Sequence, residues 1–361
     1  MARRALALTA SIGLLLAMTL PATARNINAD NLYSVHRLWS DVQGAAAGQD
    51  TDLVNGWGIV ASPTSPWWVS DNGTSKSTLY NGTTGAKVGL TFTVPGAPTG
   101  IVWNGSTAVF KVKVGAADPA ASRFIFATDD GQIAGWNGQG TAAINAVTTP
   151  GAIYLGLAIG STGGANYLYA ANFTNRTVDV FDGSWAPAHL AGDFTDPGLP
   201  ARYSPFGIQN IGGEIFVAYA KQNADGDEEV HGEGLGVVSV FGTDGTFHGR
   251  VATFGDLNSP WGLAKAGDDF GKFSGDLLVG NFGDGRIHAF KWSAEDGWEA
   301  HGVIKGVDHR PISIDGLWGI GFGNGTGSGP TSSLFFAAGP DDETHGLFGS
   351  ITAPKSGPSG H

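Results

Sequence analysis

The sequence predicts an all-β protein folded as a six-bladed β-propeller. Its 361 residues include 58 Gly and 11 Trp but no Cys, and only 14% are charged, a composition that favours short strands joined by turns. A phrase in which an aromatic or Pro residue precedes Gly and an aliphatic residue occurs six times, at spacings of roughly 40 to 57 residues. Four-stranded propeller blades repeat over this range, so the phrases predict six blades in one domain.

Each copy of the phrase is expected to begin an innermost strand. The copies are Gly56 to Val60, Pro98 to Val102, Tyr154 to Ile159, Ser204 to Ile208, Ser259 to Ala264 and Gly316 to Ile320. An apolar second strand, a third strand after a polar turn and a more polar fourth strand follow each copy. These runs are rich in Val, Ile, Phe, Tyr and Thr, and Gly, Asn, Asp and Pro bound them, as expected for strands and turns.

Ring closure is predicted from the two ends of the repeat. The sixth unit stops after its third strand, whereas the segment of about 32–42 stands just before the first phrase, where a fourth strand would normally lie. We therefore expect this N-terminal strand to complete the last blade. Such pairing leaves no open seam with exposed strand edges in the ring.

The N-terminus reads as a secretory signal peptide spanning residues 1–24. Arg3 and Arg4 precede an apolar run that ends in the small residues Ala22 to Ala24. We expect cleavage there, a propeller over residues 25–353 and a C-terminal tail over residues 354–361. The predicted location is therefore periplasmic or extracellular, without a membrane span after cleavage, and the propeller is expected to be a monomer.

Net charge argues against nucleic acid as a partner. Without residues 1–24 the chain keeps 18 basic and 32 acidic residues, a net charge of −14. Such a surface repels phosphate backbones. An unknown extracellular small molecule, glycan or protein is the expected partner.

Several long phrases resemble a family of secreted, functionally uncharacterised bacterial proteins predicted to be six-bladed propellers. They include "SPFGIQNIGG" (Ser204 to Gly213), "FSGDLLVGNFGDGRI" (Phe273 to Ile287) and "IDGLWGIGFGNG" (Ile314 to Gly325). The resemblance covers essentially the whole mature chain and implies fold and export, but no catalytic residues. More distantly, the blades resemble NHL-repeat, gluconolactonase-like and streptogramin-lyase-like propellers.

Polar residues in the turns between second and third strands form the first candidate site. By propeller geometry these turns surround one mouth of the central channel, where carboxylate and amide oxygens would suit Ca²⁺ or another divalent cation. The alternative is that Asn and Asp stand there only because they stabilise turns. The predicted metal ligands are Asn72, Asp130, Asn172 and Asn281.

Aromatic residues near the start of five inner strands form a second candidate set. Rings around a concave mouth can stack on a sugar or another flat ligand. Alternatively, they fill the space between blades. The candidate ligand-binding residues are Trp57, Tyr154, Phe206, Trp261 and Trp318.

An acidic insertion, Gln222 to Gly234, interrupts the fourth unit. Its residues Asp225, Asp227 and Glu229 offer an alternative cation site, although their spacing does not match an EF-hand loop. The insertion could equally be a lid or a solvated loop.

Histidines beside the predicted mouth supply candidates for proton transfer. His345 is the candidate catalytic acid or base, and His231 and His309 are expected nearby. Covalent catalysis finds little support, because the sequence has neither Cys nor a G-x-S-x-G motif.

Two functions agree with these residues. The first is a propeller that binds a ligand or partner at the loop-lined mouth without chemistry. The second is a hydrolase or lyase that depends on a divalent metal and acts on a lactone or ester in the channel. No nucleotide cofactor is expected in either.

Overall fold

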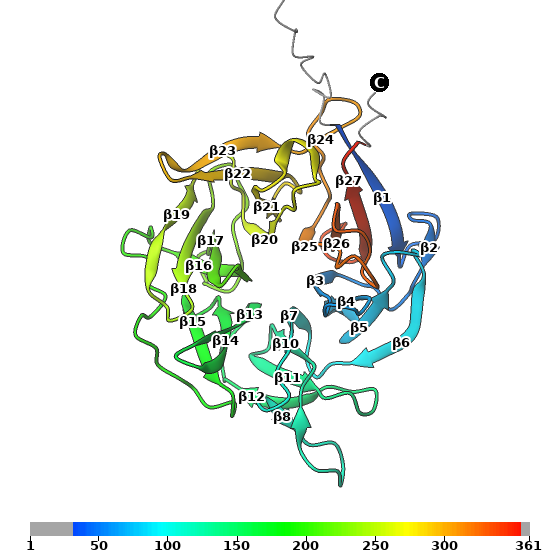
Figure 1. Cartoon of the computed structure of the whole chain (residues 1–361), viewed down its shortest axis with the longest axis vertical. Helices are drawn as coiled ribbons and strands as arrows, with labels where there is room; N and C mark the ends of the chain where they lie inside the picture. The colour runs from blue at the N-terminus through cyan, green and yellow to red at the C-terminus, as the bar shows by residue number, and fades with distance from the viewer. Residues whose placement is uncertain (1–31, 355–361) are drawn as a thin grey trace, which may run out of the picture. The chain divides into compact units, whose positions relative to one another are not determined.

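The computed structural model describes residues 32–354 and confirms the six-bladed propeller (Figure 1). The predicted signal peptide and residues 355–361 of the predicted tail lie outside these described residues. Two short 3-10 helices, η1 (Asn72–Thr74) and η2 (Gly271–Phe273), accompany the strands. Within residues 32–354, no helix has the length and apolar character needed to cross a membrane.

Four antiparallel strands build each of four blades, from the channel outward. Blade 1 contains β3 (Gly56–Val60), β4 (Trp67–Asp71), β5 (Lys76–Tyr80) and β6 (Lys87–Thr93). Blade 2 contains β7 (Pro98–Trp103), β10 (Phe124–Thr128), β11 (Gln132–Trp136) and β12 (Ile144–Thr148). Blade 4 contains β16 (Tyr203–Ile211), β17 (Glu214–Lys221), β18 (Val237–Gly242) and β19 (Phe247–Thr253). Blade 5 contains β20 (Pro260–Lys265), β21 (Leu277–Asn281), β22 (Ile287–Ser293) and β23 (Gly297–Val303).

Blade 3 departs from the expected four strands. Its sheet contains only β13 (Tyr154–Thr162), β14 (Ala165–Asn172) and β15 (Thr177–Asp182). The segment expected to be its fourth strand, residues 188–198, forms no strand, and the isolated bridge from Phe181 to Pro187 ends just before it. Proline lacks the N–H that a ladder needs, and an ion pair between the partly exposed Arg250 and the buried Asp196 ties this segment to blade 4, with Arg250 Nε 2.6 Å from Asp196 Oδ2.

Blade 6 confirms the predicted ring closure. Its strands are β25 (Leu317–Phe322), β26 (Ser333–Ala338), β27 (Leu347–Thr352) and β1 (Leu32–Ser40). β1 pairs with β27 in antiparallel fashion from Ser34↔Thr352 to Ser40↔Leu347. The short strands β2 (Gly48–Gln49) and β24 (Lys305–Gly306) flank β1, and β8 (Lys111–Val112) pairs with β9 (Ala120–Ala121) in a separate hairpin.

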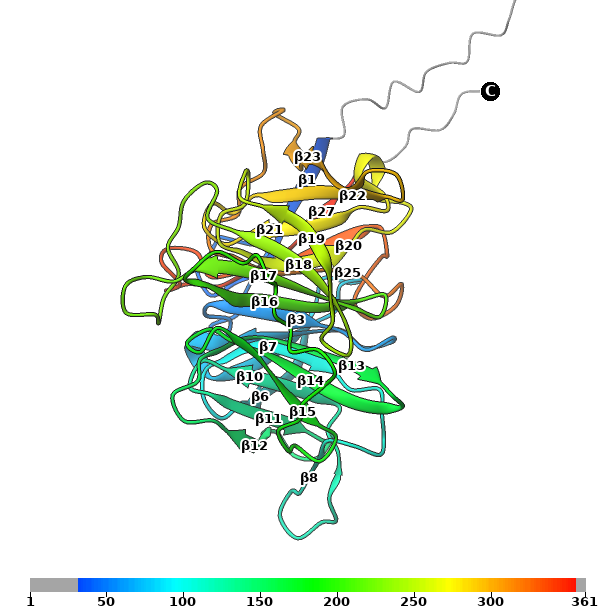
Figure 2. The ribbon, with the colours of Figure 1, turned by 90° about the vertical axis from the view of Figure 1, so that its left-hand side faces the viewer.

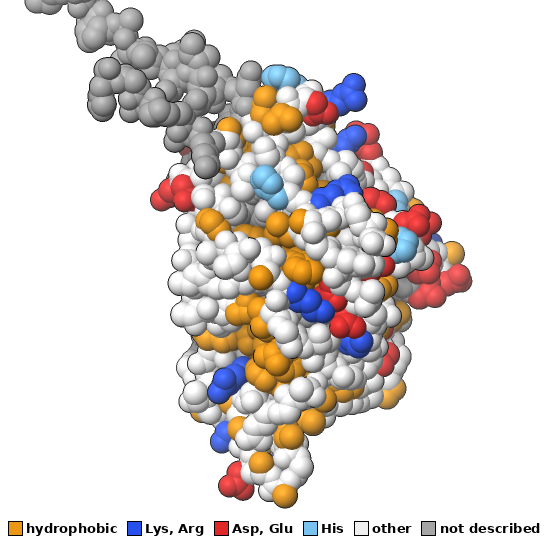
Figure 3. All heavy atoms as spheres, turned by 90° about the vertical axis from the view of Figure 1, so that its right-hand side faces the viewer, with side chains coloured by type: hydrophobic (Ala, Val, Ile, Leu, Met, Phe, Trp, Pro, Cys, Tyr) orange, Lys and Arg blue, Asp and Glu red, His pale blue; other side chains and the backbone are white. Residues whose placement is uncertain are grey.

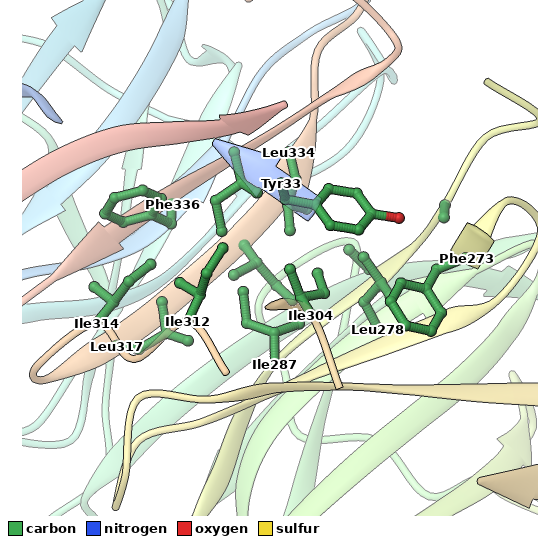
Figure 4. Close-up of a cluster of buried hydrophobic side chains, with 14 of the residues drawn as sticks. Tyr33, Phe273, Leu278, Ile287, Ile304, Ile312, Ile314, Leu317, Leu334 and Phe336 are labelled. Carbon is green, nitrogen blue, oxygen red and sulfur yellow. The ribbon is translucent and has the colours of Figure 1, made fainter. Parts of the chain in front are cut away.

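The core consists of apolar side chains packed between neighbouring blades. Figure 4 shows the cluster in which Leu278 and Ile287 of blade 5 face Leu334 and Phe336 of blade 6. Tyr33 of the closing strand joins it, is 1% exposed, and donates a hydrogen bond to the Phe270 carbonyl at 2.9 Å. The N-terminal strand therefore holds the ring together by burial as well as by strand pairing.

The repeated glycine marks the tightest contact between inner strands. A Cβ on Gly207 would lie 2.0 Å from the Trp261 carbonyl oxygen, and one on Gly100 would lie 2.3 Å from the Leu157 nitrogen. A residue with a Cβ at these positions would keep the two backbones further apart. Glycine therefore recurs because each inner strand presses against the inner strand of the next blade.

Candidate functional site

Aromatic side chains close the central channel near the mouth. In five of the six blades the residue before the repeated Gly belongs to the channel cluster, and Trp57, Phe206 and Trp318 share this cluster with Phe173 and Phe282. Trp318 is 1% exposed, and its ring stacks against Trp57 and Phe282 at centroid distances of 3.7 and 3.8 Å. This layer leaves the predicted stacking platform with almost no free ring face.

Trp261 lies across the same channel. Its Nε1 donates a hydrogen bond to the Leu155 carbonyl at 3.0 Å, which links blade 5 to blade 3. The indole is partly exposed and lines the narrow space below the aromatic layer. Of the five predicted rings, this one alone borders a described cavity of the channel.

Tyr154 does not belong with the other four aromatic residues. Aligning the phrases on glycine puts Leu155 in the position of Trp57, and Leu155 joins the channel cluster. Neighbouring residues of a strand point in different directions, so Tyr154 instead packs between blades, where its hydroxyl lies 2.9 Å from both Thr149 Oγ1 and Asp179 Oδ2. The prediction that Tyr154 is equivalent to Trp57 is therefore wrong by one residue, and Leu155 is the equivalent residue.

A polar pocket of about 530 Å³ lies at the mouth, above Phe282. Figure 2 shows the loops after β17 and β26, which supply most of its wall, on the same side of the ring. Among the described residues, neither Lys nor Arg lines this mouth pocket. Its ionisable lining residues are Glu228, Glu229, His231, Asp315, Asp342 and Glu343.

Asn55 connects the mouth pocket to the aromatic layer below it. Its Nδ2 donates to Glu343 Oε2 at 2.6 Å and to Asn72 Oδ1 at 3.3 Å, while its Oδ1 accepts from Trp318 Nε1 at 3.0 Å. Asn72 in turn donates to Asp129 Oδ2 at 3.1 Å. The sequence analysis missed Asn55 and Glu343; the polar residue three positions before the glycine in three phrases was the available signal for Asn55.

Burial raises the pKa of Glu343 above its ordinary value, and the charges of Glu229 and Asp129 add to the shift. Burial likewise raises the pKa of Asp129, with a contribution from Asp130. Both carboxyls therefore lack enough positive charge nearby to offset their desolvation. The mouth is an acidic environment without matching cationic side chains.

Glu343 belongs to a turn with an unusual backbone. Asp341, Asp342 and Glu343 have φ values of 59°, 50° and 63°, three successive non-glycine residues in the left-handed region. Each such residue costs on the order of 1 kcal/mol or more. The turn aims Asp342 and Glu343 at the mouth pocket.

Some residues of the acidic insertion line the mouth pocket, and others are exposed to solvent. Glu229 lines the mouth pocket and accepts a 3.0 Å hydrogen bond from His231 Nε2. This bond raises the pKa of His231, as do the nearby charges of Glu343 and Asp342. Asp225 and Asp227 are exposed and do not line the pocket.

The four predicted metal ligands are held in separate turns. The Asp130 carboxylate accepts from Thr128 Oγ1 and, at 2.7 Å, from Gln132 Nε2. Asn172 Nδ2 donates to Asp179 Oδ2 at 2.8 Å. Asn281 Nδ2 donates to the Asp256 carbonyl and to Asp284 Oδ1, which leaves its buried Oδ1 without a hydrogen-bond partner. These bonds stabilise turns, which is the alternative role expected for such residues.

No cluster of three or more His, Asp or Glu side chains within residues 32–354 is arranged to hold a metal ion. Three of the four predicted ligands are Asn, and that result concerns no Asn side chain, so a metal role for Asn72, Asp130, Asn172 and Asn281 stays a prediction.

The predicted catalytic histidine lies beside the mouth pocket. His345 Nδ1 is 2.8 Å from Asp41 Oδ2, and Nε2 is 3.9 Å from Asp341 Oδ2. The hydrogen bond to Asp41 raises the pKa of His345. Neither His345 nor His309 lines the pocket, whereas His231 does. His231 is thus the histidine best placed to meet a ligand there.

Comparison with known proteins identifies relatives that align with this chain over most of their length. The chain is 30% identical over 336 residues to the uncharacterised protein R648 of Acanthamoeba polyphaga mimivirus, covering 88% of this chain and 80% of R648. It is 31% identical to the uncharacterised protein L690 of the same virus, covering 88% and 85%. The chain belongs to the R648 and L690 family. No family model matches it.

Because these R648-family relatives are viral, the expectation of a bacterial family is wrong. Solved structures of other proteins resemble this chain in fold. A glucose dehydrogenase aligns with a TM-score of 0.54 and 10% identity, covering 89% of this chain and 100% of the dehydrogenase. Virginiamycin B lyase from Staphylococcus aureus aligns with a TM-score of 0.45 and 14% identity, covering 89% and 99%.

Proposed function

We propose that this protein is an exported ligand-binding propeller whose mouth pocket takes a positively charged small molecule. The observation that supports the proposal is the lining of the mouth pocket, in which five carboxyl groups have only His231 as a basic neighbour. A cationic ligand would supply the missing charge and form charge-assisted hydrogen bonds with Glu229 and Glu343. Figure 3 shows acidic side chains gathered at one rim of the ring, whereas its flank mixes charges of both signs.

An organic cation suits the pocket better than a bare ion. Phe282 forms part of the lining, and an aromatic ring attracts an ammonium group. The volume of about 530 Å³ lies within the range typical of small-molecule sites. The proposed ligand is therefore an amine or quaternary ammonium compound.

Calorimetry with putrescine and choline tests this proposal on protein dialysed extensively against EDTA and then buffer. Glu343→Gln should weaken binding about tenfold, because the amide keeps the Asn55 hydrogen bond but removes the charge. Asp225→Asn is the matched control, since it removes one charge from an exposed residue outside the pocket. Binding of neither probe, or equal losses in the two variants, would overturn the proposal.

A hydrolase or lyase acting on a lactone or ester is the second candidate. It is favoured because Glu343 and His231, both with raised pKa values, share the mouth pocket, and such groups suit proton transfer near neutral pH. Turnover of a lactone or ester that Glu343→Gln and His231→Asn abolish would support it. Elemental analysis after dialysis, with thermal unfolding in EDTA and in Ca²⁺, tests the predicted divalent metal.

A further inference from the structure

The end of the channel opposite the mouth is open and apolar. The aliphatic residue after each repeated Gly lines a space of about 30 Å³ on the channel axis. That space shares Ile59, Gln209, Leu263 and Ile320 with a wider cavity of about 300 Å³ at the opposite end. Because Trp318 and its neighbours close the mouth side, the channel is a blind pore lined largely by aliphatic side chains. We call the wider cavity the rear pocket.

The rear pocket has two polar groups free to meet a ligand. Lys265 is its one charged lining residue, and no carboxylate within residues 32–354 forms an ion pair with it. The Lys265 ammonium lies 5.9 Å from the centroid of the Trp298 ring. The exposed Gln209 side chain makes no hydrogen bond with the described part of the chain.

Trp67 Nε1 is buried without a hydrogen-bond partner in residues 32–354, and the two Asn side chains of the rear pocket are already engaged. Asn210 Nδ2 donates to the Ile159 carbonyl at 2.8 Å, and its Oδ1 accepts from the Gly213 N–H. Asn324 Nδ2 donates to the Ser62 and Ser65 carbonyls. Specific recognition therefore depends on one cation and one amide beside an apolar wall.

We infer that the rear pocket binds a monocarboxylate with an unbranched apolar chain. The chain would leave water to contact Ile59, Leu263 and Ile320, and the carboxylate would meet the Lys265 ammonium at the rim with the Gln209 amide beside it. The charge of the rear pocket is opposite to that of the mouth pocket. This second site does not depend on the proposed function of the mouth.

Octanoate, octylamine and octanamide are the probes that test this inference, with binding followed by calorimetry and by tryptophan fluorescence. Wild-type protein should bind octanoate more tightly than either analogue, and affinity should rise from butanoate to octanoate. Lys265→Met should weaken octanoate binding about tenfold and leave octanamide unchanged, because it removes only the charge.

Two control variants separate this site from other surfaces. Lys291→Met changes an exposed lysine of the same blade outside the rear pocket, so octanoate binding should stay within about twofold of wild type. Glu343→Gln should also leave it unchanged, which keeps failure of this inference distinct from failure at the mouth. Absence of octanoate binding, equal binding of octylamine, or no effect of Lys265→Met would overturn it. Thermal unfolding confirms that each variant folds.

Discussion

The two ends of the channel differ although the same six-fold phrase builds both. At the mouth, the residue before the glycine is a buried ring in several blades, and carboxyl groups surround the pocket above. At the rear, the residue after the glycine is Ile or Leu in every blade, and Lys265 stands at the rim. Residues two positions apart in a strand share a face, so one short phrase closes one end and lines the other.

Removing the central ring of the aromatic layer should have the largest effect. Trp318→Ala would leave a cavity beside Trp57 and Phe282 and should lower the free energy of unfolding by about 3–5 kcal/mol. Urea denaturation measures this change. Trp292→Ala is the control, because Trp292 is 55% exposed and should change stability by less than about 0.5 kcal/mol. Similar losses would mean that the layer does not hold the ring together.

Substituting the repeated glycine should have the next largest effect. Gly207→Ala places a methyl group against the Trp261 carbonyl and should cost about 1–3 kcal/mol, as the two inner strands move apart. Gly89→Ala is the matched control, since a Cβ there meets nothing within 4 Å. Thermal melting compares the two variants. An unchanged melting temperature for Gly207→Ala would show that the inner strands are not tightly packed.

A smaller effect is expected from the turn residues that are predicted metal ligands. Asn172→Ala removes the hydrogen bond to Asp179 and should lower the free energy of unfolding by about 1 kcal/mol. It should leave putrescine binding at the mouth pocket unchanged. Loss of a Ca²⁺-dependent rise in melting temperature in this variant would instead favour a metal role for Asn172.

The smallest expected effect is the pH dependence of the mouth pocket. Glu343 has a raised pKa and carries its negative charge only above that value, whereas His231, also with a raised pKa, loses its positive charge as pH rises. Both changes make the mouth pocket more negative, so affinity for choline should increase from pH 5 to pH 8. Calorimetry at several pH values checks this trend. The His231→Asn variant should lose the part of the increase in choline affinity that occurs at the higher pH values. A flat profile would contradict it.

The stability contributions of these two groups follow the same titrations. Because the folded-state pKa of His231 is raised, its favourable contribution is present at low pH and lost as pH rises through that value. For Glu343, ionisation in the buried position opposes folding, so stability decreases as pH rises between the unfolded and folded pKa values. The protonated forms of both groups therefore favour folding, whereas ionised carboxyl groups favour cation binding.

Local patterns in the sequence were sufficient to predict the blades and their closure. Alternating apolar residues and turn signals located the strands, and the missing fourth strand of the last unit located β1. The missing fourth strand of blade 3 was not predicted, because its segment bonds to residues of blade 4 that are distant in sequence, among them Arg250 with Asp196. The position of Tyr154 was predicted wrongly, because a shift of one residue along a strand reverses the direction of the side chain.

The sequence by itself determined the repeat, the ring and the acidic insertion, since strand period, glycine spacing and charge are local properties of the chain. Only the tertiary structure decided which polar residues meet. Asn55 contacts Glu343 across 288 positions, and Glu229 and Asp342 line one pocket although they belong to different blades. Closing the ring creates these neighbours, and the raised pKa of Glu343 arises from that convergence together with its burial.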